Sequence, residues 1–210
     1  MVYKAVIFDV DGTLVHTMPE YRYEVVGKAL TELGSDSTKQ GIDRFWFEGD
    51  RDAVIKKDFK LSPQTFWPVY RKHDSPDVRK KFVKPYDDIG FLAELRRKNI
   101  KIGILTGAPP HIASINLEIL GEENFNAIVI AFGANGIVPK PHPCGLKECL
   151  KLLKVNRKEA IYVGNADEDI ATAKNAKVFD VLISRGEYDT SLTPSLTISS
   201  LFDLRHLVKI

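Results

Sequence analysis

Two carboxylates stand two residues apart near the start of the sequence, in VIFDVDGTL, where Asp9 and Asp11 follow an apolar run. A short apolar run predicts a buried strand, in which residues i and i+2 face the same side, so both carboxylates are expected to project together. Such like charges repel unless a cation joins them or one member holds a proton. Both conditions are typical of catalysis, whereas the structural alternative is an Asp-Gly turn after a strand.

Three further groups of polar residues follow later apolar runs: Thr106-Gly107, Lys140-Pro141, and the stretch GNADED at 164–169. In a parallel sheet, the residues after each strand meet at one edge. Carboxylates, an ammonium, a hydroxyl and loop N–H groups together suit a phosphate beside a magnesium ion. Each group also has a structural reading: a helix cap, a solvated loop, and acids that complement a helix dipole.

The elements that must position these residues alternate between strands and helices. Short apolar runs predict strands, each followed by turn residues and a helical pattern. Besides the first run, these are Ile100 to Leu105, Ala127 to Ala131, Ala160 to Val163 and Phe179 to Ile183. The alternation predicts an α/β fold with a doubly wound, Rossmann-like parallel sheet, which binds ligands beyond the carboxyl ends of its strands.

The interval before the second strand is too long for one crossover, which predicts a small α-helical cap at residues 16–84 and a core of residues 1–15 and 85–210. Within the cap we expect a helix from Pro19 to Leu33, a polar and aromatic loop DRFWFEGDR, a helix near 52–59, and helices that begin after Ser62 and Ser75. A helix that buries Ile89, Leu92 and Leu95 leads back into the core.

Composition narrows the class of protein. The 210 residues carry a net charge of only +2, which argues against a nucleic-acid partner. Without a signal-like start or an apolar run of membrane length, we expect a cytoplasmic protein with no membrane partner. Cys144 and Cys149 are interpreted as reduced packing residues, and His111 and His142 show no second ligand that would make a metal site.

The order of these motifs, DVDGTL, Thr106, Lys140-Pro141 and the acids after Gly164, resembles the haloacid dehalogenase (HAD) superfamily. The likeness is to its phosphatase branch with a C1-type helical cap, phosphoglycolate phosphatase-like, and covers essentially the whole chain. The resemblance implies a magnesium-dependent phosphatase that hydrolyses a small phosphorylated metabolite through an aspartyl-phosphate intermediate.

The resemblance also implies roles for single residues. Asp9 would be the nucleophile, Asp11 the general acid and base, and Lys140 the neutralising cation. Thr106 would hold a phosphate oxygen, and the neighbouring substrate-binding positions are Gly12, Thr13 and Gly107.

The magnesium ion would be bound by Asp9, the Asp11 carbonyl and an acid of the fourth motif. This chain has Asn165 where the branch commonly has an acid directly after the glycine. Asp169 lies four residues later, on the same helical face if the helix has begun, and is predicted to be the main metal anchor, with Asn165 assisting. Asp167 and Glu168 are alternatives for this ligand.

The cap offers Arg44 and Arg51 as candidate substrate-binding residues, beside the aromatic run at 45–47 that equally suits the core of a small domain. His16 is expected to be a solvated hinge residue. Two alternatives stay open: a sugar-phosphate phosphomutase and a non-catalytic phosphometabolite-binding protein. A dehalogenase fits less well, because members of that type lack the second Asp, whereas this chain has Asp11 and Thr13. The sequence is compatible with a monomer or a homodimer.

Overall fold

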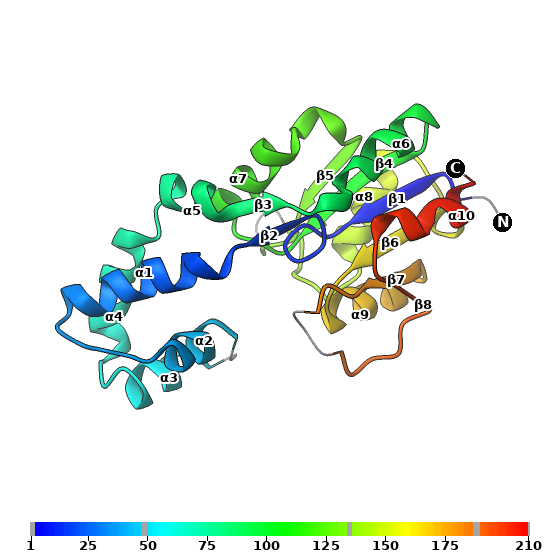
Figure 1. Ribbon diagram of the computed structural model, residues 1–210. Coiled ribbons are helices and arrows are strands. Elements are labelled where there is room, and N and C mark those ends of the chain that lie inside the picture. The colour runs from blue at the N-terminus through cyan, green and yellow to red at the C-terminus, as the bar shows by residue number, and fades with distance from the viewer. Residues whose placement is uncertain (1–2, 48–49, 134–135, 187–189, 210) are drawn as a thin grey trace. The chain divides into compact units, whose positions relative to one another are not determined.

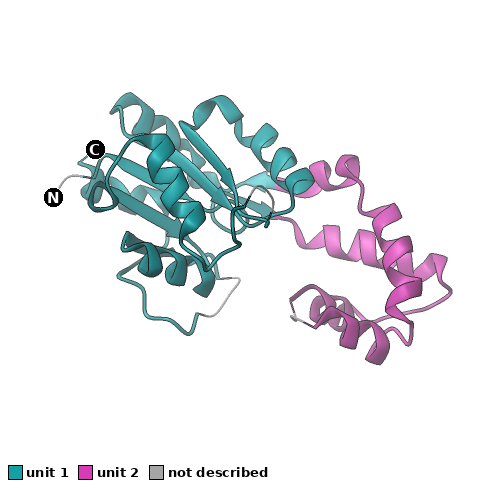
Figure 2. Ribbon diagram, turned by 180° about the vertical axis from the view of Figure 1, so that it is seen from behind, with its two compact units in different colours: residues 1–16, 84–210 teal, residues 17–83 magenta. Residues whose placement is uncertain are grey.

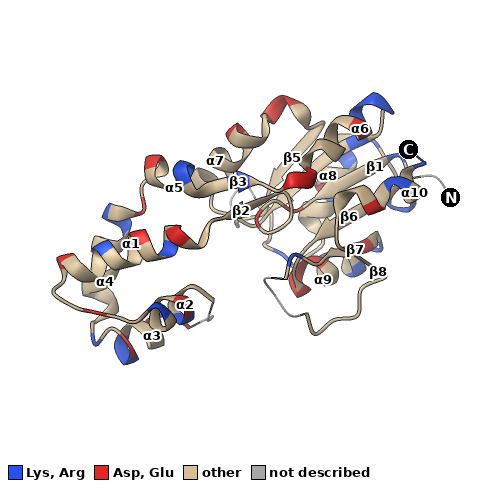
Figure 3. Ribbon diagram, in the orientation of Figure 1, with Lys and Arg blue, Asp and Glu red and all other residues tan. Residues whose placement is uncertain are grey.

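The structure is a computed structural model that describes residues 3–47, 50–133, 136–186 and 190–209. The chain divides into two compact units, unit 1 with residues 1–16 and 84–210 and unit 2 with residues 17–83 (Figure 2). Each border lies one residue from the predicted limits of the cap. Charged residues of both signs occur in both units (Figure 3).

A parallel sheet forms the centre of unit 1 (Figure 1). Its described strands are β1 (Ala5–Phe8), β4 (Lys101–Thr106), β5 (Ala127–Ile130), β6 (Ala160–Gly164), β7 (Phe179–Ile183) and β8 (Leu196–Ile198), in the order β5-β4-β1-β6-β7-β8. All four residues of β1 are buried, as expected for a strand covered on both faces. The predicted α/β fold is confirmed.

The helices of unit 1 cover the sheet on both faces. They are α6 (Phe91–Arg97), α7 (Pro110–Leu120), α8 (Cys144–Leu153), α9 (Asp167–Ala176) and α10 (Arg205–Val208), with short 3₁₀ turns η1 (Asp87–Gly90), η2 (Glu122–Asn124), η3 (Arg157–Glu159) and η4 (Leu201–Leu204). Helices α8 and α9 pack on each other and on β4 to β7. From β1 the chain adds β4 and then β5 on one side of the sheet, and from β6 it adds β7 and then β8 on the other side. Because crossovers between parallel strands are right-handed, this change of direction puts α6 and α7 on the face of the sheet opposite to α8 and α9.

Unit 2 is a small helical bundle inserted between β2 (Val15–Thr17) and β3 (Val83–Pro85), two short strands that pair with each other. Its helices are α1 (Pro19–Glu32), α2 (Lys39–Phe47), α3 (Arg51–Lys57), α4 (Pro63–His73) and α5 (Pro76–Phe82). The predicted N-caps are confirmed, because the Ser62 and Ser75 hydroxyls accept the backbone N–H groups of Thr65 and Val78.

Two local predictions were wrong. The stretch from Asp43 to Phe47, expected in a loop, belongs to α2, because Ile42 and Phe45 are spaced by three and are both buried in the core of unit 2. Glu48 and Gly49 of that predicted loop lie outside the described residues. The helix expected around Ile89 is divided into η1 and α6, and Ile89 is only half-buried.

Both cysteines lie in α8 and are free thiols, as interpreted from the sequence. Cys149 is fully buried against β4, where its thiol approaches the Ile104 carbonyl at 3.7 Å. In the part of the chain that the structure describes, no helix combines the length and the apolar character that a membrane crossing requires.

Candidate active site

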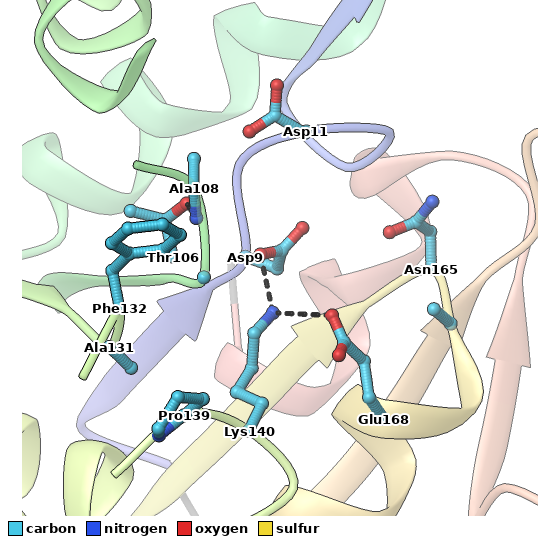
Figure 4. Close-up of a pocket in the computed structure, with 12 residues that line it drawn as sticks. Asp9, Asp11, Thr106, Ala108, Ala131, Phe132, Pro139, Lys140, Asn165 and Glu168 are labelled. Atoms are coloured by element: carbon cyan, nitrogen blue, oxygen red, sulfur yellow. Dashed lines mark hydrogen bonds and ion pairs between the residues drawn. The ribbon is translucent and has the colours of Figure 1, made fainter. Parts of the chain in front are cut away.

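A cavity of about 550 Å³ lies at the carboxyl edge of the sheet in unit 1. One part of its lining is polar and comes from Asp9, Asp11, Lys140, Asn165 and Glu168. The other part is formed by Thr106, Gly107, Ala108, Ala131, Phe132, Pro139 and Ala166 (Figure 4). The residues that follow β1, β4, β5 and β6 therefore meet at one place, as the sequence predicts.

Asp9 stands directly after β1 and is buried, with 5% of its surface exposed. Its backbone N–H donates to the Val163 carbonyl at 2.9 Å, and its Oδ1 accepts a hydrogen bond from Lys140 Nζ at 2.8 Å. Burial raises the pKa of Asp9 to about 7; the Lys140 ammonium opposes this shift, while Asp169 and Asp11 add to it. The site thus holds a carboxylate whose charge depends on its cationic neighbour.

Lys140 comes from the segment between β5 and α8, and only 3% of its side chain is exposed. Its Nζ lies 2.8 Å from Asp9 Oδ1, 2.7 Å from Asp169 Oδ1 and 3.6 Å from Glu168 Oε1. Burial acts to lower the pKa of Lys140, but the surrounding negative charges, Asp9 first, hold it well above its usual value. The side chain is therefore an ammonium fixed between carboxylates.

Asp169 does not line the cavity, although the sequence predicts it as the main metal anchor. Its Oδ1 accepts from Lys140 at 2.7 Å and from the Tyr162 hydroxyl at 2.8 Å, and its Oδ2 accepts the backbone N–H groups of Asn165 and Ala166, each at 3.2 Å. Both carboxylate oxygens are thus engaged within the protein. The structure gives Asp169 the position of a support for Lys140, and metal binding by Asp169 stays a prediction.

Gly164 makes this arrangement possible. A Cβ atom at residue 164 would lie 2.3 Å from Cγ of Asp169, which is too close for two carbon atoms that are not bonded to each other. Because glycine has no Cβ, the Asp169 carboxylate can fold back over the end of β6.

Asn165 is buried yet borders the cavity. Its Oδ1 accepts from the Thr13 hydroxyl at 3.4 Å. The neighbouring Gly12 has φ +79°, and a Cβ atom there would meet Asn165 Nδ2 at 2.1 Å, so only glycine lets the loop after β1 pass this side chain. Gly12, Thr13 and Asn165 therefore lie together, but Gly12 and Thr13 do not line the cavity, and substrate binding by these two residues stays a prediction.

Asp11 borders the same cavity, but its carboxylate is turned away from Lys140 (Figure 4). The strand ends at Phe8, so the alternation that would project Asp9 and Asp11 together does not continue to Asp11. Instead, Asn116 Nδ2 of α7 donates to Asp11 Oδ1 at 2.9 Å. The predicted common orientation was wrong, while the shared cavity agrees with the sequence.

Thr106 and Gly107 close the β4 side of the cavity. The Thr106 hydroxyl is buried and accepts the N–H of Ala108 at 3.1 Å, which fixes the turn between β4 and α7. Since α7 has Pro109 at its N-cap, Thr106 stabilises the turn before the helix rather than capping the helix itself. A hydroxyl and loop N–H groups at this position are suited to phosphate oxygens.

Arg44 and Arg51 belong to unit 2. Arg44 Nε donates to Asp58 Oδ2 at 2.9 Å, and the Arg51 guanidinium lies over the rings of Phe45 and Trp46, at 5.6 and 5.9 Å from their centroids. Phe45 is fully buried in the core of unit 2. Substrate binding by the two arginines stays a prediction.

Sequence reasoning missed two residues of the site, Asn116 and Tyr162. Each is a buried polar residue within an apolar stretch, INL of α7 and AIYVG of β6. A buried polar group requires a hydrogen-bond partner, so a polar residue within an apolar stretch was the signal by which the sequence could have identified both residues. His16, expected to be a solvated hinge residue, is half-buried and stacks on Tyr86 with ring centroids 4.9 Å apart.

The donor set at the cavity consists of hard oxygen ligands. Asp9 offers a carboxylate and Asn165 an amide oxygen on the same lining. The described residues contain no cluster of three His, Cys, Asp or Glu side chains suited to a metal, as a zinc site would need. Magnesium commonly binds through one or two carboxylates together with water and substrate phosphate, so the residues present fit this ion.

Comparison with known proteins agrees with this geometry. Residues 6–183 match the family model of the haloacid dehalogenase-like hydrolases. The chain is 26% identical to a phosphoglycolate phosphatase of Aquifex aeolicus, covering 98% of this chain and 96% of the relative. It is 30% identical to a glyceraldehyde 3-phosphate phosphatase of Methanopyrus kandleri, covering 88% and 85%.

Among solved structures, a HAD phosphatase of Thermococcus onnurineus superposes with a TM-score of 0.69 and 26% identity, covering 98% of this chain and 97% of the other. The match of the family model spans most of the sequence and includes every motif of the cavity. The chain thus belongs to the haloacid dehalogenase-like hydrolase family and is an enzyme of that family.

Proposed function

We propose that this enzyme is a magnesium-dependent phosphatase that hydrolyses a small phosphate monoester through an aspartyl-phosphate intermediate. The observation that carries the proposal is the pairing of a buried carboxylate with a buried ammonium, Asp9 Oδ1 to Lys140 Nζ at 2.8 Å, on a cavity that Thr106 and Asp11 also line. A phosphate monoester is an anion, and this cation allows it to approach the anionic nucleophile.

In the first step, Asp9 Oδ2 attacks phosphorus while Lys140 keeps Oδ1 in place. The bond between phosphorus and the ester oxygen breaks, and Asp11 supplies a proton to the leaving alkoxide. In the second step, Asp11 removes a proton from water, whose oxygen attacks phosphorus and releases Asp9 and inorganic phosphate. Asp11 serves both steps from the loop after β1, where Asn116 holds one of its oxygens.

Asp9 and Asn165 would hold the magnesium ion, together with the Asp11 carbonyl that the resemblance implies. When bound, the ion supplies positive charge that neutralises the phosphoryl oxygens. Thr106 and the N–H groups of the following turn bind the remaining phosphate oxygens. The main metal ligand after β6 is therefore Asn165, while Asp169 fixes Lys140.

The substrate class follows from the site and from the names of the relatives. Phosphoglycolate and glyceraldehyde 3-phosphate, the substrates in those names, are both small phosphate monoesters. We assign the same class, without choosing a member of it, to this enzyme. The cytoplasmic location, the role of unit 2 as a cap, and the monomeric or homodimeric state stay predictions.

The test is release of phosphate from an aryl phosphate and a panel of small phosphate monoesters, with magnesium and with chelator. Asp9→Asn should abolish turnover, because it removes the nucleophile and changes little volume. The matched control is Asp167→Asn, since the Asp167 carboxylate accepts the N–H groups of Ser191 and Leu192 and does not border the cavity.

Magnesium-dependent turnover in wild type and in Asp167→Asn, lost in a folded Asp9→Asn, would support the proposal. Equal turnover in Asp9→Asn and wild type would exclude the aspartyl-phosphate route. Isomerised sugar phosphate without free phosphate would identify a phosphomutase instead, and phosphate-ester binding without any turnover would identify a non-catalytic binding protein.

A further inference from the structure

Tyr162 is a buried tyrosine of β6 that does not line the cavity, with 1% of its surface exposed. Its hydroxyl lies 2.8 Å from Asp169 Oδ1 and 3.5 Å from the Leu105 carbonyl. A phenol has one proton to donate, and the shorter distance and the negative charge both direct it to Asp169. The hydroxyl therefore belongs to the network of Asp169.

Apart from the contact with the Leu105 carbonyl at 3.5 Å, the described neighbours of Tyr162 offer its hydroxyl no hydrogen-bond partner other than Asp169. The ring belongs to an apolar cluster with Ile7, Leu105 and Cys149, between the sheet and helices α8 and α9. A phenylalanine would fill the same volume without the cost of burying a polar group. The hydrogen bond to Asp169 therefore explains why a hydroxyl is present at this position.

Asp169 Oδ1 accepts from two donors, Tyr162 and Lys140, while its Oδ2 is held by two backbone N–H groups. Lys140 is in turn shared between Asp169 Oδ1 at 2.7 Å and Asp9 Oδ1 at 2.8 Å. Two carboxylates therefore compete for one ammonium. A donor on Asp169 Oδ1 disperses its negative charge and weakens its hold on Lys140.

We propose that Tyr162 is a positioning residue for the reaction: its hydroxyl balances the sharing of Lys140, so that the ammonium stays available to Asp9 and to the phosphate. This inference rests on the proposed role of Lys140 and adds to it a residue that never touches the substrate. In Tyr162→Phe, the uncompensated Asp169 would draw Lys140 away from Asp9, and the phosphate would meet less positive charge.

The first experiment compares wild type with Tyr162→Phe in kcat/KM and in the dissociation constant for inorganic phosphate, by titration calorimetry with magnesium. Losing a hydrogen bond to a charged group should lower kcat/KM about tenfold and weaken phosphate binding about threefold. The binding stoichiometry should stay unchanged, and since the dissociation constant reports only folded protein, a loss of stability alone would not move it.

Tyr70→Phe is the matched control, because Tyr70 is a buried tyrosine beside an aspartate, Asp74, in unit 2. It should leave both the dissociation constant and kcat/KM unchanged. A second comparison places Tyr162→Phe in the background of Asp169→Asn, where the competing charge is gone. There the substitution should change kcat/KM by less than about twofold, because coupled residues are not additive.

Unchanged kcat/KM and phosphate affinity in Tyr162→Phe would overturn the inference while leaving the proposed function intact. An equal loss in both backgrounds would also overturn it, because Tyr162 would then act without Asp169. If wild type releases no phosphate, the proposed function fails, and the phosphate dissociation constants still decide the role of Tyr162. Absence of phosphate binding in wild type would overturn both.

Discussion

Asp9, Lys140 and Asp169 place two carboxylates around one ammonium in a region that water hardly reaches, since each of these side chains is at least nine-tenths buried. Asp11 and Glu168 on the cavity lining add further negative charge. The folded protein therefore holds more negative charge at the site than Lys140 alone neutralises. Such an arrangement favours binding of a cation over stability of the empty site.

This charge imbalance gives Asp9 a stability effect that depends on pH. The pKa of Asp9 rises from 3.8 to about 7 on folding, mainly through burial, so the folded state keeps a proton that the unfolded state loses. Below pH 3.8 both states are protonated and the effect is absent. Between these two pKa values, stability falls as the pH rises, and above pH 7 the full cost remains.

Asp9→Asn removes that cost, because the amide stays neutral while Lys140 keeps its partner Asp169. We expect the metal-free variant to melt about 5 °C above wild type at pH 8 and at the same temperature below pH 4. Thermal unfolding with chelator at both pH values measures this, with Asp36→Asn, an exposed aspartate, as the control. A lower melting temperature of Asp9→Asn at pH 8 would contradict the stated charge balance.

At the same scale, the sequence placed most of the site residues on the cavity, whereas Asp169, expected there as the metal anchor, does not line it. Spacing of four residues puts Asn165 and Asp169 on one face only if a helix has already begun. Helix α9 begins at Asp167, so Asp169 stands in its first turn and its carboxylate folds back onto the N–H of Ala166. The residue at which a helix begins decides in which direction the side chains of its first turn point. A sequence pattern gives the ends of a helix less reliably than its middle.

At the scale of elements, a buried ion pair ties η1 to the turn after β7 and to the loop that carries the candidate catalytic residues. Arg185 donates from two nitrogens to Asp88, at 2.9 and 3.0 Å, and from Nη2 to the Thr13 carbonyl at 2.8 Å. Both side chains of the pair are 9% exposed. The backbone of Thr13 is therefore held by a residue at the far end of the sequence.

We expect Asp88→Asn to lower the free energy of unfolding by about 3 kcal/mol, because breaking a buried pair leaves the Arg185 charge uncompensated. Urea denaturation of both proteins at neutral pH checks this value. Glu94→Gln is the control, since its ion pair with Arg205 is partly exposed, with 47% of the Arg205 side chain and 17% of the Glu94 side chain accessible, and should change the unfolding free energy by less than about 1 kcal/mol. A similar effect from both substitutions would contradict a special role of the buried pair.

The strands could be predicted where an apolar run is continuous, as in β1, β4 and β6, because a strand covered on both faces leaves no place for polar side chains. Strand β8 has three residues, of which Ile198 is buried, and gives too short a pattern. In α2, the apolar residues are mixed with Asp43 and Arg44, a pattern that indicates a loop. The helix is apparent only from the tertiary packing, which buries Phe45.

At the scale of the molecule, each unit has a core of its own. In unit 2, the Phe45 ring lies within 5.7 Å of the ring centroids of Phe59, Phe66 and Tyr70. Phe91 of α6 is as deeply buried in unit 1. Two cores within one chain can lose stability separately. The sequence indicated where unit 2 is inserted, because the interval between the first two strands of the core is too long for one crossover.

Phe45→Ala should therefore accelerate hydrogen exchange of the buried amides at 17–83 and leave the strands of unit 1 protected. The cavity is expected to cost about 4 kcal/mol in unit 2. Phe91→Ala is the matched substitution and should produce the opposite distribution. Equal acceleration in both units with either substitution would show that the chain unfolds as one body. Hydrogen exchange followed by mass spectrometry resolves the two regions.

The central place of β1 in the sheet governs the order in which the chain can assemble. Its two neighbours pair with Ala5 through Lys101 and Ala160, which are synthesised long after it. The apolar residues of β1 are therefore synthesised before either neighbour, and they gain the second neighbour only after β6 has been made. The strand that delivers the nucleophile thus depends on pairings of long sequence separation on both sides, which slow folding and leave its apolar residues open to misassembly until β6 is available.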